Sequence, residues 1–325
     1  MKKFIYEMEL VSAEVIKKDS FDIFLLAGGS DYRAYEILRI MKSEDVSINK
    51  ILLFAFQERI QGIDTSDAYY NYLKIGFSNI LPIHCSIKEP NSCLDGLISL
   101  ESEILTAKKI ALDISCFTKP FFFYLIKLFK ERFKIHRITV FYTEPQSYLF
   151  PRGIFSSYRS STGPLTILEI PGFTGYEARG DKRVLVILLG FDGDLSKEIN
   201  EDISPSETLV VNGFPSYAPK FKDISLIANE KLTSDKDVQI IFSKANNPFD
   251  VFNLLESIKN KKHNDRPFIN IAPLGTKPMA LGVCLFALYY PEVRVVYPLP
   301  ETYEKITTDN CWNSWRYLIP LNELR

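Results

Sequence analysis

Two short stretches of the chain, 158 positions apart (119 to 277), share a Thr-Lys-Pro core. They read LDISCFTKPFFF from Leu112 to Phe123 and IAPLGTKPMAL from Ile271 to Leu281. In each stretch an apolar run ends, Thr-Lys-Pro follows, and a second apolar run begins. Proline is favoured in the first turn of a helix, where its missing amide hydrogen costs no hydrogen bond. Each copy therefore predicts the end of a strand, a tight turn and a new helix.

Apolar runs alternate with helical patterns along both halves of the chain. Strands that are apolar without alternation are typical of a parallel sheet covered by helices on both faces. Strands, some with the turn that follows, are predicted at 21–29, 50–56, 79–85, 110–115 and 137–143, and again at 182–194, 207–213, 237–244, 267–275 and 292–300. The sequence therefore predicts an α/β fold with two tandem Rossmann-like, doubly wound parallel-sheet domains.

The two halves align at a constant offset. Pro248 follows Pro90 by the same 158 positions (90 to 248) that separate the two Thr-Lys-Pro copies. A repeat of this length is typical of a duplicated domain, because solenoid repeats are far shorter. We therefore predict an internal duplication, with one domain at 1–150 and a second at 183–325 that ends in a docking tail. The Gly-, Ser- and Pro-rich stretch 151–182 is predicted to be a linker or a hairpin excursion.

Charge and composition exclude several classes of function. With 39 basic and 40 acidic residues the net charge is −1, which argues against long duplex nucleic acid as the main partner. Five cysteines without a CxxC pair and only three histidines give no zinc-ligand pattern, so neither a metal nor a cofactor is expected. The apolar runs are too short to cross a bilayer, so no membrane partner is expected. Reduced thiols and the lack of a signal-peptide core favour a cytoplasmic protein.

Polar and small residues collect where the first and fourth predicted strands of each half end. In a parallel sheet of order 3-2-1-4-5 these two strands are neighbours, and ligands bind in the crevice at their C-terminal ends. The candidate ligand-binding residues are Gly28, Gly29, Ser30, Asp113, Ser115, Thr118 and Lys119 in the first half, and Gly190, Asp192, Asn270, Gly275, Thr276 and Lys277 in the second.

This set of residues suits the recognition of an anion such as phosphate. A helix N-terminus offers unbonded amides and a partial positive charge, glycine lets a phosphate approach the backbone, and lysine adds a full charge. Each feature also has a purely structural explanation. Thr118 and Thr276 are ordinary helix N-cap residues, their lysines suit a solvated surface, and the carboxylate of Asp192 repels phosphate.

The same residues resemble a known family. DISCFTK, from Asp113 to Lys119, fits the D/N-x-S/T-x-x-x-R/K pattern that follows the fourth strand in CARF domains, the CRISPR-associated Rossmann folds. INIAPLGTKPMALG resembles the Asn…Gly-Thr-Lys-x-Met-Ala form of that motif. The second copy has one extra residue between Asn270 and Lys277, and Ala272 and Pro273 stand where a hydroxyl is usual. The resemblance covers the two strand-four regions by motif and the rest of each half by topology alone.

The resemblance implies a sensor of a nucleotide second messenger, of cyclic oligoadenylate type, in prokaryotic antiviral defence. We find no effector domain, so it further implies a stand-alone sensor that signals to a separate effector protein, and it leaves homo-oligomerisation open. Two alternatives stay open. One is a slow, metal-independent ring nuclease in which Ser115, Thr118 and Lys119 orient the ribose hydroxyl, although no histidine lies at either motif to assist. The other is a non-catalytic structural subunit of a defence or restriction system. No catalytic residue is assigned.

Overall fold

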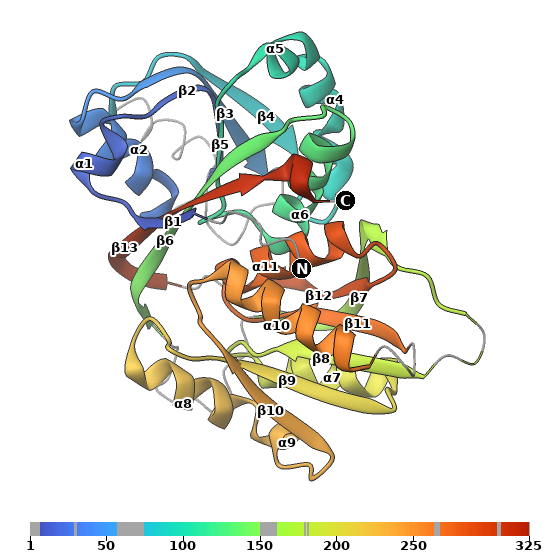
Figure 1. Ribbon diagram of the computed structural model, residues 1–325. Helices are drawn as coiled ribbons and strands as arrows, with labels where there is room; N and C mark the ends of the chain where they lie inside the picture. The colour runs from blue at the N-terminus through green and yellow to red at the C-terminus, as the bar shows by residue number, and fades with distance from the viewer. Residues whose placement is uncertain are drawn as a thin grey trace. The chain divides into compact units, whose positions relative to one another are not determined.

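The computed structural model describes residues 7–28, 31–56, 75–149, 161–178, 180, 182–262, 267–303 and 307–324. The chain forms two compact units (Figure 1). Unit 1 combines the chain up to Leu149 with the stretch from Ile306 to Leu324, and unit 2 runs from Phe150 to Lys305. No helix in the described ranges is long and apolar enough to span a lipid bilayer.

Unit 1 contains a seven-stranded sheet whose centre is parallel. Its strands are β1 (Glu7–Leu10), β2 (Ser20–Ala27), β3 (Ser47–Phe56), β4 (Ile80–Cys85), β5 (Ile110–Asp113), β6 (Arg137–Leu149) and β13 (Thr307–Pro320). They lie in the order β1-β13-β6-β5-β2-β3-β4. The five strands from β2 to β6 are mutually parallel, and in chain order their arrangement is 3-2-1-4-5. The two remaining strands extend the β6 side antiparallel to their neighbours.

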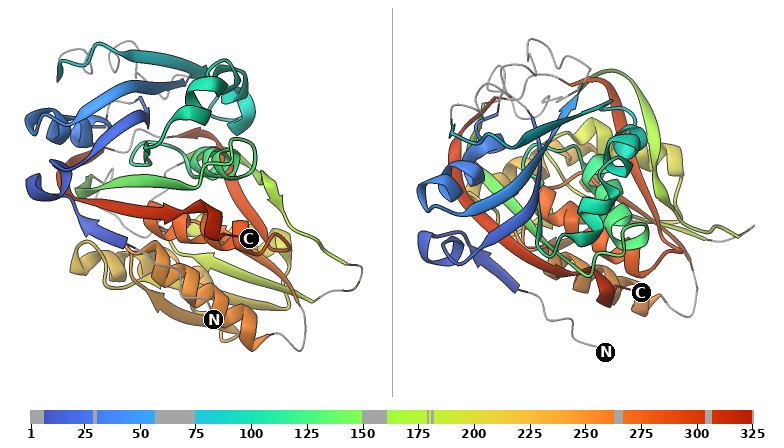
Figure 2. Two further views of the ribbon diagram at one scale, coloured as in Figure 1. Left: turned by 45° about the horizontal axis from the view of Figure 1, so that its top comes forward. Right: turned by 90° about the horizontal axis from the view of Figure 1, so that it is seen from above.

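Helices cover both faces of this sheet (Figure 2). They are α1 (Ala13–Ile16), α2 (Arg33–Ser43), η1 (Pro90–Cys93), α4 (Leu94–Ile98), α5 (Glu101–Thr106) and α6 (Lys119–Glu131), with η4 (Leu321–Glu323) after the last strand. Residues of α1 and α2 pack with Phe24, Leu26 and Phe141 in one core cluster. On the other face α6 buries a run of three phenylalanines, Phe121 to Phe123. Continuous apolar strands therefore have a covered surface on either side.

Unit 2 contains a six-stranded sheet with the same parallel centre. Its strands are β7 (Ser161–Thr174), β8 (Arg183–Leu188), β9 (Glu207–Gly213), β10 (Val238–Ser243), β11 (Phe268–Pro273) and β12 (Arg294–Tyr303), in the order β10-β9-β8-β11-β12-β7. From β8 to β12 all pairs are parallel, so the order is again 3-2-1-4-5. The prediction of two doubly wound α/β sheets is confirmed, with the shared topology that an internal duplication requires.

The helices of unit 2 follow the same plan. They are α7 (Gly193–Ile203), α8 (Pro219–Ala228), α9 (Glu230–Thr233), α10 (Pro248–Lys261) and α11 (Lys277–Tyr289). Figure 1 shows α10 and α11 together on one face of the sheet and α7 on the other. Both Thr-Lys-Pro copies start helices of 13 residues, at Lys119 and at Lys277, with the proline in the first turn. The prediction made from the repeated motif therefore holds in both units.

The last strand does not belong to the second half, where the predicted domain 183–325 placed it. Strand β13 pairs antiparallel with β6 along most of its length, for example Tyr317 with Val140. In addition, the hydroxyl groups of Thr143 and Ser314 lie 2.8 Å apart. The outer edge of β6 has backbone groups that need partners, and β13 provides them. In the same way β7, from the stretch predicted as a linker or hairpin, pairs antiparallel with β12 of unit 2.

Candidate functional site

In unit 1 a crevice was predicted at the C-terminal ends of β2 and β5, and these two strands are parallel neighbours. After β2 the backbone amide of Gly28 donates to the carbonyl of Phe54 at 2.9 Å, so this glycine still follows the sheet. Gly29 and Ser30 lie outside the described residues. The loop between β5 and α6 follows one of these two strand ends.

Asp113 and Ser115 fix the loop after β5. Asp113 is 2% exposed, and its Oδ1 accepts a hydrogen bond from the amide of Ser115 at 2.8 Å. The hydroxyl oxygen of Ser115, fully buried, accepts from the amide of Thr143 on β6 at 2.9 Å. The pattern quoted from the sequence thus orders the backbone that carries Thr118 and Lys119. Neither Asp113 nor Ser115 presents an exposed side chain to a ligand.

Thr118 occupies the N-cap position of α6 without capping it. Its backbone is extended (φ −69°, ψ 154°), as an N-cap requires, yet its side chain accepts no amide hydrogen bond from the helix. The hydroxyl is buried and has no hydrogen-bond partner in the described part of the protein. An unpaired buried hydroxyl costs free energy, so a polar group of a ligand is a natural partner for it. Lys119 follows as the first residue of the helix and is half-buried.

Arg33, which the sequence analysis did not single out, is a buried cation in the first turn of α2. Asp31 holds it: Oδ1 and Oδ2 each accept from Nε at 3.1 Å, and Oδ2 accepts from Nη2 at 2.6 Å. The side chain of Arg33 is 10% exposed. Burial opposes its charge, but the charge of Asp31 and its hydrogen bonds hold the pKa of the guanidinium well above the ordinary value. Arg33 is therefore charged at any physiological pH.

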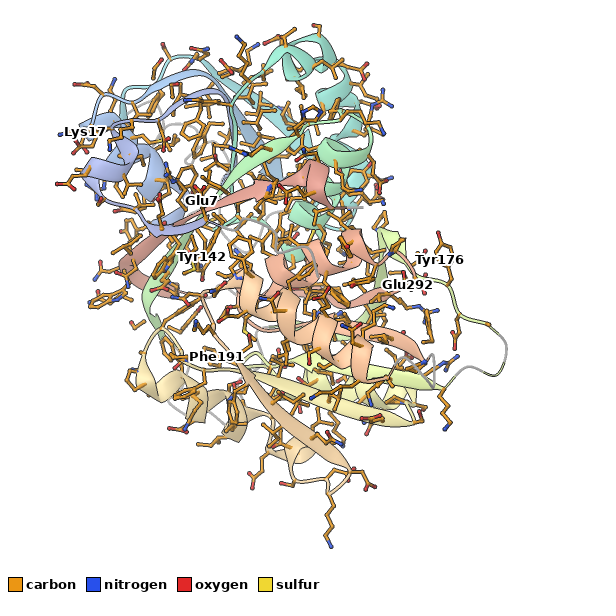
Figure 3. All side chains as sticks on the ribbon, in the orientation of Figure 1. Glu7, Lys17, Tyr142, Tyr176, Phe191 and Glu292 are labelled. Atoms are coloured by element: carbon orange, nitrogen blue, oxygen red, sulfur yellow. The ribbon has the colours of Figure 1, made fainter. Side chains whose placement is uncertain are left out.

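The groups that act electrostatically on Arg33 come from the elements that border the crevice. They include Tyr142 of β6, labelled in Figure 3, and Cys116 of the β5–α6 loop. Arg33 in turn affects Tyr148 further along β6, whose pKa is raised mainly by burial. Burial, with the charges of Glu36 and Asp31, raises the pKa of the Cys311 thiol to about 12. That thiol is protonated at neutral pH and is no nucleophile.

A buried carboxylate stabilises the pairing of β6 with β13. Glu144 is 2% exposed, and it accepts from the indole Nε1 of Trp315 at 2.6 Å and from Nδ2 of Asn313 at 3.3 Å. Burial raises the pKa of Glu144, and these two donors oppose the rise. Trp315 of β13 is thus tied to β6 through a hydrogen bond. Trp312 is 55% exposed.

In unit 2 the turn after β8 is packed against its own neighbours. A Cβ on Gly190 would lie 2.5 Å from the carbonyl oxygen of Leu274, in the loop after β11. The carbonyl of Gly190 accepts from Ser225 Oγ at 3.0 Å and from Asn229 Nδ2 at 2.9 Å. These contacts explain the glycine without a ligand.

The start of α7 is likewise used by the fold. Asp192 caps the helix, because its Oδ1 accepts from the amide of Leu195 at 3.4 Å. A Cβ on Gly193 would lie 1.8 Å from the carbonyl oxygen of Ala228, so only glycine fits there. Phe191 of this turn, labelled in Figure 3, packs its ring against Phe221 of α8.

The loop between β11 and α11 also differs from its counterpart in unit 1. Thr276 is a working N-cap: its Oγ1 accepts from the amide of Met279 at 3.3 Å and donates to the carbonyl of Ala245. A Cβ on Gly275 would lie 3.2 Å from the carbonyl oxygen of Leu189, a tight but milder approach. Lys277 is half-buried at the helix start.

Asn270 lies in the middle of β11, paired with Leu185, and is fully buried. Neither polar atom of its side chain has a partner among the described residues. The sheet register aligns Asp113 with Leu26, one residue before the end of β2, and Ala272 with Ile187, one residue before the end of β8. Ala272 is therefore the counterpart of Asp113, and Asn270 lies two residues further from the crevice.

No group of three or more His, Cys, Asp or Glu side chains within the described ranges is placed to hold a metal ion. The sequence matches no protein-family model and no curated protein. Among solved structures, the fold is similar to that of a Type III CRISPR defence DNA nuclease activated by cyclic oligoadenylate, with a TM-score of 0.52 and 10% sequence identity over 85% of this chain.

The chain spans 65% of that nuclease, and the similarity at this level of identity establishes a shared fold. A protein of the universal stress type from Pseudomonas aeruginosa UCBPP-PA14 aligns over 87% of this chain and 95% of its own, at 11% identity. Its TM-score of 0.25 is too low to relate the two folds.

Proposed function

We propose that this chain is a sensor of a nucleotide second messenger of cyclic oligoadenylate type. It binds the messenger at the C-terminal edge of its parallel strands and reports it to a separate effector protein in the cytoplasm. The observation that carries the proposal is the start of α6, after the fourth strand of unit 1. There the hydroxyl of Thr118, which has no hydrogen-bond partner among the described residues, precedes the side chain of Lys119. The fold that the chain shares with a nuclease activated by cyclic oligoadenylate supports this class of ligand.

The residues of unit 1 take distinct parts in this proposal. Lys119 contacts a phosphate, and Thr118 bonds a phosphate oxygen or a ribose hydroxyl, assisted by the positive end of α6. Gly28 borders the ligand with its backbone, and the predicted contacts of Gly29 and Ser30 lie outside the described residues. Asp113 and Ser115 act indirectly, since their hydrogen bonds hold the loop in place.

In unit 2, Lys277 is the residue proposed to contact a phosphate. The other candidate residues of unit 2 have structural roles. Gly190 and Gly275 allow close packing, Asp192 and Thr276 cap helices, and Asn270 lies inside the unit. We therefore propose that unit 1 provides most of the binding free energy. Occupation of its crevice is the signal that an effector reads.

Calorimetric titration with cyclic tri-, tetra- and hexa-adenylate tests the function. We expect one ring size to bind with measurable heat, and Lys119→Ala to abolish most of that heat. Lys127→Ala is the matched control, since Lys127 lies two turns along the same helix and pairs with Glu131 at the surface. Absence of heat with every ring would overturn the proposal.

Chromatography of the ligand recovered after the titration separates a sensor from a ring nuclease. A sensor returns the ring intact after prolonged incubation. A linear product that depends on Lys119 or Thr118 would replace the sensor with the enzyme. A structural subunit, the remaining alternative, gives neither binding nor cleavage.

A further inference from the structure

The ion pair between Asp31 and Arg33 joins residues that are two positions apart on one turn of the chain. Such a pair connects no two elements of the fold. Arg316 is a useful contrast, since it pairs with Glu9 of β1 and with Asp19 and so ties β13 to the N-terminal part of the sheet. Burying a guanidinium costs free energy that a local pair does not clearly recover. The buried position of Arg33 therefore calls for a reason other than stability.

The geometry leaves one side of the guanidinium available. Asp31 engages Nε and Nη2 and thereby fixes the plane of the group. Asp31 is its sole hydrogen-bond partner within the described ranges, and none of the residues in these ranges accepts a hydrogen bond from Nη1. A guanidinium held along one edge presents its other N–H groups in a fixed direction, which suits a phosphate oxygen.

The surroundings place Arg33 at the crevice of unit 1. It belongs to the first turn of α2, an 11-residue helix that follows β2, and its electrostatic neighbours are Cys116 and Tyr142. Lys119 begins the helix that follows β5, the strand beside β2. Two cations thus start the two helices on either side of the switch point. At the equivalent turn of unit 2 the chain carries two carboxylates, Asp192 and Asp194.

We propose that Arg33, oriented by Asp31, is a second phosphate contact of the unit 1 crevice, so that this crevice selects a nucleotide ligand with two neighbouring phosphates. This inference rests on the proposed function and deepens it. Arg33 and Lys119 each take one phosphate, and the hydroxyl of Thr118 lies at the start of the second helix. A ligand with a single phosphate can contact only one of the two cations.

The test compares wild-type protein with variants in titrations of cyclic tri-, tetra- and hexa-adenylate, inorganic pyrophosphate and adenosine. The main variant carries Asp31→Asn with Arg33→Gln, because removing both charges leaves no unpaired buried ion and preserves folding. We expect it to bind the ring and pyrophosphate on the order of tenfold to a hundredfold more weakly, the loss typical of charged hydrogen bonds. Arg33→Lys keeps the charge and loses the planar fork, so its affinity for the ring should lie between those of the wild type and the double variant. Adenosine binding should not change.

Arg39→Gln is the matched control, since Arg39 lies on the same helix, pairs with Glu36 and has a side chain that is 63% exposed. Equal ring affinity for the double variant and this control overturns the inference and leaves the sensor function standing. Binding of pyrophosphate that depends on Arg33, without binding of any ring, overturns the sensor function and supports the anion site. A wild-type protein that binds neither a ring nor pyrophosphate overturns both the sensor function and the anion site.

Discussion

The turn after the first strand carries a buried arginine in unit 1 and two carboxylates in unit 2, although both turns follow the central strand of a 3-2-1-4-5 sheet. In unit 1, Asp31 and Arg33 of the same turn form an ion pair. In unit 2, Asp192 caps α7, and glycines at 190 and 193 let the backbone of neighbouring segments approach closely. The turn of unit 2 is thus used for helix capping and close packing, whereas the guanidinium of Arg33 in unit 1 bonds only Asp31 among the described residues.

The loops after the fourth strands differ in the same sense. Thr276 both donates and accepts hydrogen bonds, while the hydroxyl of Thr118 has no partner among the described residues. A duplicated topology therefore does not duplicate the chemistry of its edge. The two Thr-Lys-Pro copies therefore both start a helix, but they differ in whether the threonine hydroxyl is already hydrogen-bonded within the described part of the protein.

The largest effect is expected at Gly193. Its replacement by alanine would place Cβ 1.8 Å from a backbone carbonyl of α8, so we expect Gly193→Ala to destabilise unit 2 by about 4 kcal/mol or more. Gly275→Ala, whose nearest contacts are at 3.2 Å, should cost far less. Urea denaturation followed by circular dichroism measures both. Similar stabilities for the two variants would show that unit 2 has room at this turn, as a ligand site does.

Asp31→Asn should destabilise unit 1 by about 3 kcal/mol, because it leaves the buried charge of Arg33 without its partner. Tryptophan fluorescence reports this unit selectively, since the two tryptophans of the chain, Trp312 and Trp315, both lie on β13. A ligand that supplies a negative charge should restore part of the loss. An unchanged urea midpoint would mean that the pair is accessible to water and that the two turns differ less than described.

Lys119→Ala should weaken messenger binding by about 1.5–3 kcal/mol, the range for a hydrogen bond to a charged group. We expect a smaller loss for Lys277→Ala, because the other candidate residues around it serve the fold. Isothermal titration of both variants with the ring that binds the wild type gives the two values. A larger loss for Lys277→Ala reverses the ranking of the two crevices.

The smallest effects separate the two threonines. Thr276→Val removes a helix cap and should cost about 1 kcal/mol of stability. Thr118→Val replaces a buried hydroxyl that has no partner among the described residues, so it should leave stability unchanged or raise it while weakening ligand binding. Thermal unfolding and titration of each variant measure these opposite signs. Equal destabilisation would mean that Thr118 is a helix cap after all.

The positions of the strands and the helix starts were predictable because they depend on local patterns. Strands such as β3 and β8 contain continuous apolar runs, and each Thr-Lys-Pro marks a helix start within three residues. The position of Asn270 in the middle of β11 was not predictable. The alignment of the two motifs contains one extra residue and did not reveal that Ala272, paired with Ile187, is the counterpart of Asp113.

The pairing of the last strand depends on contacts that no local pattern encodes. The partner of β13 is β6, and Thr143 and Ser314, whose hydroxyls are hydrogen-bonded, are 171 positions apart in the sequence. Arg33 did carry a local signal, because it precedes Ile37 and Met41 by four and eight residues and so shares the buried face of α2. Asp31 two positions earlier is a second signal, which reads equally well as a helix cap.

The return of β13 to the first sheet has a consequence for biosynthesis. A ribosome completes every residue of unit 2 before it makes the strand that covers β6, so the nascent N-terminal unit waits with one edge uncovered. During that interval the edge is open to wrong partners, including the same strand of another nascent chain. Unit 1 is thus the first unit to be translated, but its sheet is the last to be completed.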